Sequence, residues 1–179
     1  MIIKLSLETI KSRSPYFVDM VSDKGPFAFT SDSGVELAVD FVDDDLITTT
    51  ESYQLVVSNV NNRQSPRDKK VQDTVFAIVE EFFEKNQAAL LYVCETGDGK
   101  QMARYRLFRY WFDMFEYSKK YTSLSTSLTD EDGIMNAATV FIRNDNPQLP
   151  KIVSEFNETA MLLRQNRIDP EVWTGTGMK

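Results

Sequence analysis

The stretch FAFTSDSGVELAVDFV, residues 27–42, decides the fold that the sequence predicts. Large apolar side chains alternate with small or polar ones over residues 27–30 and again over 35–42. A period of two is typical of strands that bury one face. Between the two runs, the sequence SDSG at residues 31–34 is a hairpin signal. We therefore expect two antiparallel strands joined by a tight turn.

Further strands are predicted on both sides of this hairpin. A β-rich run over residues 16–21 precedes it, and a run over 53–60 follows it, so residues 16–60 are expected to form a four-strand meander. The continuous apolar run at residues 88–94 predicts a central strand that is buried on both faces. Residues 122–129 and 134–143 flank an acidic turn and predict a second hairpin.

Three helices are predicted between and after these strands. The first follows Ser65, a suitable N-cap, and carries apolar residues at helical spacing; the second covers Lys100 to about Tyr117; the third opens at Asn146-Pro147. The resulting order predicts an α+β fold, a largely antiparallel curved sheet with the helices gathered on one face. We expect one domain over residues 1–168 and a frayed tail over 169–179.

The composition excludes several classes of function. The 179 residues include no histidine and one cysteine, which excludes a Ser-His-Asp triad, a Cys-His dyad, a Cys/His zinc site and an internal disulfide. The net charge of −7 argues against binding to nucleic acid or an anionic membrane. The longest charge-free run, residues 52–62, is too short to span a membrane, and the start lacks a signal-peptide pattern. These features predict a cytoplasmic protein.

The predicted second helix is basic and aromatic within an acidic protein. Residues 100–120 carry six basic and two acidic side chains. On a helical wheel, Arg106, Arg109, Asp113 and Glu116 form the predicted solvent stripe, and Arg109 and Asp113 are spaced as an i, i+4 ion pair. The remaining arc is apolar and aromatic, so we expect it to be buried as core rather than exposed for base stacking.

Arg104 falls inside this apolar arc, beside Trp111. A buried charge requires compensation, which leaves three alternatives: an ion pair with an internal acid such as Asp73, extension along Trp111 to the surface, or a bound anion. Glu95 and Asp98 are the other acids considered as ion-pair partners. The candidate binding residues at this helix start are Asp98, Lys100, Gln101, Arg104, Arg106 and Arg109.

Three other features of the sequence bear on catalysis. Asp98-Gly99-Lys100 fits the acid-x-Lys half of a metal-dependent nuclease pattern, in which carboxylates hold the metal and lysine assists the attacking water. The run GDGKQ at residues 97–101 lacks the first glycine and the Ser/Thr of a phosphate-binding P-loop. Cys94 ends the predicted buried strand and is interpreted as a small core residue, since no histidine can activate it.

The run YVCETGDGKQMARYRLF, residues 92–108, followed by Trp111-Phe112, resembles the core signature of a bacterial family of unknown function. The segments at residues 73–75 and 82–83, and Asn146-Pro147, are also similar to that family. The resemblance covers roughly residues 15–165 and implies a cytoplasmic bacterial protein. It implies no activity.

Together these observations predict a non-enzymatic binding or interaction protein with no cofactor and no metal. Its expected contact surface is the loop and helix start at residues 97–109, engaging an acidic partner protein or a small anionic ligand. Self-association is expected as well, because so aromatic a helix is hard for one small domain to cover. The alternative is a metal-dependent nuclease or phosphotransfer enzyme, of a toxin or phage-defence type, that uses Asp98 and Lys100.

Overall fold

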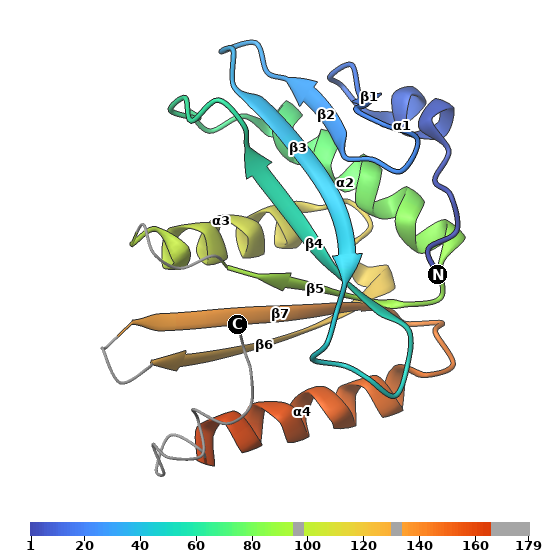
Figure 1. Cartoon of the computed structure of the whole chain (residues 1–179), viewed down its shortest axis with the longest axis vertical. Helices are drawn as coiled ribbons and strands as arrows, with labels where there is room; N and C mark the ends of the chain where they lie inside the picture. The colour runs from blue at the N-terminus through green and yellow to red at the C-terminus, as the bar shows by residue number, and fades with distance from the viewer. Residues whose placement is uncertain (95–98, 130–133, 166–179) are drawn as a thin grey trace.

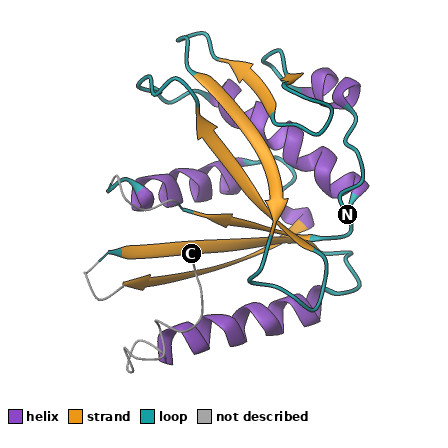
Figure 2. Ribbon diagram, viewed as in Figure 1, coloured by secondary structure: helices purple, strands orange, loops and turns teal. Residues whose placement is uncertain are grey.

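The computed structural model describes residues 1–94, 99–129 and 134–165 and has an α+β fold. Within them a mostly antiparallel sheet of seven strands in the order β1-β2-β3-β4-β5-β7-β6 is covered by helices (Figures 1 and 2). The elements are α1 (Leu7–Arg13), β1 (Asp19–Met20), β2 (Phe27–Thr30), β3 (Glu36–Asp43), β4 (Ser52–Asn59), α2 (Lys69–Lys85), β5 (Ala89–Val93), α3 (Gln101–Met114), the 3-10 helix η1 (Ser118–Lys120), β6 (Tyr121–Thr129), β7 (Met135–Arg143) and α4 (Leu149–Gln165).

The predicted hairpin of residues 27–42 is confirmed as β2 and β3. Phe29 pairs with Leu37, and both side chains are buried, as the period-two pattern requires. Gly34 occupies the turn with a φ of +81°, a conformation that glycine adopts without strain. The first predicted strand, at residues 16–21, is reduced to the two residues of β1. Tyr16 and Val18 are buried, but they lie outside regular strand structure.

The strands β4 and β5 are parallel, the one parallel pairing among the described strands, and α2 is the crossover between them. This β4–α2–β5 unit brings the carboxyl ends of two neighbouring strands to the same edge of the sheet. The carboxyl ends of parallel strands are where open sheets of this kind commonly form ligand sites. The crossover therefore fixes where the candidate site lies.

The helices do not gather on one face of the sheet, and that expectation is wrong. Leu90 of β5 packs in the cluster that α2 and α3 cover, whereas Leu91 packs with Ile152 and Phe156 of α4 on the opposite face. Figure 1 shows α4 on the other side of the sheet from α2 and α3. The reason is visible in β5 itself: a strand that is buried on both faces needs cover on both sides.

A fourth helix, α1, was not predicted and packs against α2. Ser6 caps it by accepting a hydrogen bond from the Thr9 backbone N–H at 3.2 Å, and only Ile10 is buried along its length. The buried carboxylate of Glu81 on α2 accepts the Ser6 N–H at 2.9 Å. A helix of seven residues, about two turns, with one buried residue has too little periodicity for a sequence pattern to reveal.

The N-cap of α2 lies three residues later in the chain than predicted. Asp68, not Ser65, caps the helix by accepting the Lys70 backbone N–H at 2.8 Å. Asp68 also accepts a hydrogen bond from the Tyr16 hydroxyl, whose oxygen in turn accepts the Asp32 N–H at 3.1 Å. Burial raises the pKa of Tyr16, so its hydroxyl remains a donor to Asp68 at neutral pH.

Replacing Asp68 with alanine should therefore lower the free energy of unfolding by about 2 kcal/mol, since both the helix cap and the acceptor for Tyr16 are lost. Urea denaturation of the two proteins measures this difference. Ser65→Ala is the matched control and should cost less than about 0.5 kcal/mol. An equal loss of stability in both variants would contradict the assignment of the N-cap to Asp68 rather than to Ser65.

Candidate functional site

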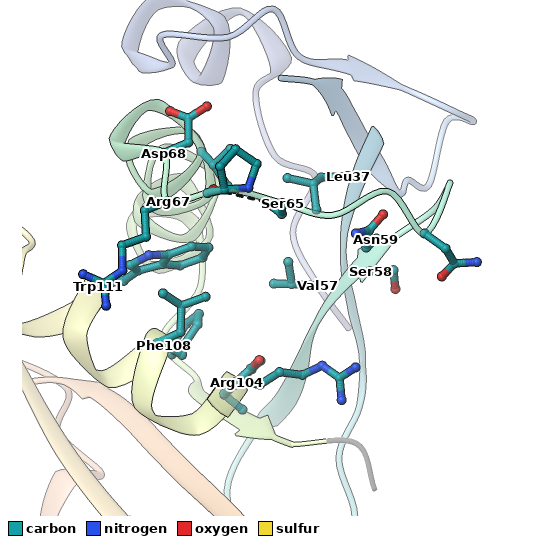
Figure 3. Close-up of a pocket in the computed structure, with 15 residues that line it drawn as sticks. Leu37, Val57, Ser58, Asn59, Ser65, Arg67, Asp68, Arg104, Phe108 and Trp111 are labelled. Atoms are coloured by element: carbon teal, nitrogen blue, oxygen red, sulfur yellow. Dashed lines mark hydrogen bonds between the residues drawn. The ribbon is translucent and has the colours of Figure 1, made fainter. Parts of the chain in front are cut away.

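A cavity of about 470 Å³ opens between the end of β4, the segment that leads into α2, and one side of α3 (Figure 3). Its walls combine apolar, aromatic, polar and charged side chains from five parts of the chain. The lining residues are Leu37, Val57, Ser58, Asn59, Asn62, Ser65, Pro66, Arg67, Asp68, Val71, Tyr92, Arg104, Leu107, Phe108 and Trp111. This is a mixed pocket of the size that small molecules occupy.

The cavity exists because β4 is longer than its pairing with β5. The register of the two strands runs from Ser52 opposite Ala89 to Leu55 opposite Tyr92, and β4 continues to Asn59. Beyond Tyr92, β5 no longer flanks β4, and Val57 therefore faces the opening between α2 and α3. The site thus lies at the carboxyl end of the one parallel pair described above.

Aromatic packing builds the α3 wall of the cavity. Phe108 stacks on Tyr92 with ring centroids 4.1 Å apart, and Trp111 lies 6.2 Å from Phe108. The Gln72 side-chain amide of α2 donates to the Trp111 carbonyl at 3.4 Å and joins the two helices beside the site. Phe108 is buried and Trp111 is half-buried, so one ring fixes the helix while the other borders the open space.

Two arginines approach the cavity from different elements. Figure 3 shows Arg67 reaching from the segment before α2 along Trp111, and Arg104 reaching from the start of α3 toward the β4 side, so that the two guanidinium groups point away from each other. Arg67 is exposed, and among the described residues its guanidinium makes no hydrogen bond or ion pair. The one lining carboxylate, Asp68, is already engaged by Tyr16 and by the Lys70 N–H. The charged residues that line the cavity are thus two arginines and one aspartate.

A protein-family model of unknown function, DUF6169, matches residues 67–158. This match covers more than half of the chain. The chain belongs to the DUF6169 family. Searches of curated proteins and of solved structures returned no match. The region shared with the DUF6169 model runs from Arg67 into α4, so it includes both arginines and the aromatic wall of the cavity.

Of the residues predicted to bind, Arg104 is the one described residue that lines the cavity of this DUF6169 protein. Lys100 is exposed at the N-cap position of α3, and Arg106 and Arg109 are exposed on its outer side. Gln101 is buried, with its side-chain oxygen unpartnered among the described residues. Asp98 lies outside the described residues. Within the predicted surface at 97–109, the described residues that line the cavity are Arg104, Leu107 and Phe108.

The predicted orientation of α3 is wrong in two respects. The expected Arg109–Asp113 ion pair is not formed in the described part of the chain; Arg109 donates instead to the Tyr105 hydroxyl at 3.3 Å. Four residues of the arc expected to be buried are exposed: Leu107 by 40%, Tyr110 by 54%, Met114 by 60% and Tyr117 by 38%. The buried side is narrower than the apolar arc and is centred on Phe108, Phe112 and Phe115.

Sequence reasoning missed Arg67 and the β4 end of the site. Arg67 stands 37 positions before Arg104, in a segment that the helix pattern treated as part of the first turn. The available signal was the apolar run at 88–94: a central strand implies a crossover, and a crossover brings the start of α2 to the end of β5. In this DUF6169 protein that proximity makes Arg67 part of the site.

Cys94 is a buried core residue, as expected. Its side chain is 4% exposed, and burial raises the pKa of the thiol to about 11, although the nearby positive charge of Arg104 acts in the opposite direction.

Within the described residues, no group of three or more Cys, Asp or Glu side chains could hold a metal ion. Across those same residues, every helix is too short or too polar to cross a membrane.

Proposed function

We propose that this DUF6169 protein binds a small anionic ligand that carries a flat apolar group, in the cavity between β4 and α3. The observation that carries the proposal is the pairing of two arginines with an aromatic wall around one cavity of about 470 Å³. Guanidinium groups bind carboxylates and phosphates in a fixed planar geometry. Aromatic rings favour a flat apolar partner that stacks on them.

The polar residues on the β4 side complete this recognition scheme. Ser58 and Asn59 end the strand, and Ser65 lies across from them before α2 (Figure 3). Polar groups set among apolar walls orient a ligand and give the site its specificity. Arg67 and Arg104 flank the opening on opposite sides (Figure 3), and we expect their long side chains to turn toward the ligand's anionic group while its flat part lies against Trp111 and Phe108.

A concave site favours a small ligand over the acidic face of a partner protein. An arginine that docks on a protein surface needs a broad contact area, whereas the two arginines here border a concave, half-open cavity. The enzyme alternative stays a prediction, because Asp98 lies outside the described residues and Lys100 lines no part of this cavity. We therefore place a binding role first.

The test is isothermal titration of the full chain with phenyl phosphate, benzoate and indole-3-carboxylate, compared with inorganic phosphate and phenol. At least one aromatic anion should bind. Its affinity should exceed that of inorganic phosphate, which lacks the ring, and that of phenol, which lacks the anionic group. Arg67→Gln should weaken that binding about tenfold or more, because a charge-assisted hydrogen bond contributes about 1.5–3 kcal/mol.

Arg106→Gln is the matched control, since Arg106 is exposed on α3 and does not line the cavity. Its affinity for the aromatic anion should equal that of the wild type. The proposal fails if none of the aromatic anions binds, or if Arg67→Gln and Arg106→Gln bind equally well. Arg104→Gln should match Arg67→Gln, and the melting temperature of each variant shows whether it is folded.

A further inference from the structure

The outer face of α3 carries an apolar stripe that the described residues of the chain leave exposed. Ala103, Leu107, Tyr110 and Met114 follow the spacing i, i+4, i+7, i+11, and all four are exposed. This is the spacing at which one helix packs along another. Tyr117, 38% exposed, extends the apolar surface just beyond the helix end. Large apolar side chains that line up on one exposed face mark an interaction surface.

The charges beside the stripe identify its occupant. Arg106 and Asp113 lie seven residues apart on the same flank, and both are exposed. Neither forms an ion pair within the described part of the chain. When a second copy of the same helix lies antiparallel to the first, the positive charge of each helix comes level with the negative charge of the other.

We propose that two copies of this protein associate through α3, with the two helices antiparallel about a twofold axis near Arg109 and Tyr110. The midpoint of Arg106 and Asp113 falls at this axis, so each Arg106 lies level with Asp113 of the second copy, and the contact forms twice. Leu107 then lies close to the level of Met114 of the second copy, and the two Tyr110 side chains meet near the axis.

A parallel arrangement is disfavoured by the same charges. It would place Arg106 beside Arg106 and Asp113 beside Asp113, which is repulsive along the whole flank. The contact is limited to one helix of 14 residues, so it lies at the small end of protein interfaces. The dimer is therefore expected to dissociate on dilution.

This inference does not depend on the proposed ligand site. Arg106 and Asp113 do not line the cavity, and substitutions there leave Arg67 and Arg104 in place. Leu107 contributes to both surfaces, so it is not used in the test. Loss of dimerisation with ligand binding intact, or the reverse, separates the two proposals.

The experiment is sedimentation velocity of the full chain between about 10 µM and 1 mM at low ionic strength, where surface charges are least screened. The wild type should pass from monomer to dimer across this range. Arg106→Asp and Asp113→Arg should each raise the dimer Kd about tenfold or more, because each places like charges opposite one another twice. The double variant R106D/D113R restores both contacts and should dimerise as the wild type does.

Mixing the two single variants gives the sharpest outcome. Each variant alone is repelled by its own copy, but a mixed pair has opposite charges at both contacts, so a heterodimer should form. Lys24→Asp, which makes the same change of charge in the β1–β2 turn, is the control and should not alter the Kd. A wild type that stays monomeric to 1 mM, or a double variant that is not restored, overturns the proposal.

Discussion

Replacing Phe108 with alanine should lower the free energy of unfolding by about 3–5 kcal/mol, the usual cost of truncating a buried phenylalanine. The side chain is 4% exposed and joins α3 to the sheet. Its ring lies 4.1 Å from Tyr92 of β5 and 5.6 Å from Phe141 of β7, measured between centroids. It also lies 5.7 Å from Phe76 of α2. Denaturation in urea, followed by circular dichroism, measures the loss.

Tyr110→Ala is the matched control, because Tyr110 is an aromatic residue of the same helix that is 54% exposed. It should cost less than about 0.5 kcal/mol in the monomer, measured at low protein concentration. Similar losses in the two variants would mean that Phe108 does not anchor α3. Because Phe108 also borders the cavity, its truncation should weaken ligand binding even where the protein remains folded.

The strands were predictable because their information is local. Phe27 and Phe29 alternate with small or polar neighbours, and Gly34 supplies the turn, so the β2–β3 pairing follows from residues close in sequence. The same reasoning gave β6 and β7. Which strands lie next to β5 was not predictable, because that depends on the crossover through α2 and on where β7 returns.

The orientation of α3 shows the limit of helical periodicity. The wheel gave a wide apolar arc, and charge alone was used to choose the solvent side around Arg106 and Arg109. The sheet surface available to one helix is narrower than that arc, so Phe108 and Phe112 are covered whereas Tyr110 is not. The apolar pattern shows how much of a helix surface favours burial. The sheet covers only part of that surface on α3, and covering the rest requires a second surface.

The candidate site was predictable in part for a similar reason. Arg104 was conspicuous because a charge beside Trp111 contradicts the local pattern, and such contradictions concentrate at functional positions. Arg67 contradicts nothing in its own segment, which is polar and exposed. Its role depends on a neighbour far along the chain, and only the three-dimensional arrangement reveals it.

The thiol of Cys94 should react with iodoacetamide at pH 8 at least about 100-fold more slowly in the folded protein than in urea. Burial raises its pKa to about 11 from an ordinary value of 9.0, which reduces the thiolate fraction at pH 8 about 100-fold, and the thiolate is the reactive form. Burial to 4% exposure slows the reaction further. Mass spectrometry of timed samples follows the single cysteine without interference from another thiol.

The pH dependence identifies the cause. A raised pKa makes the folded-state rate climb about tenfold per pH unit from pH 8 toward 11, whereas the rate in urea levels off near pH 9. Arg104 opposes the effect of burial, so Arg104→Gln should raise the pKa of the thiol further and slow the reaction at pH 8. Comparable rates in folded and unfolded protein would contradict a buried Cys94. They would also reopen the question of a nucleophile beside Arg104, at the edge of the proposed ligand site.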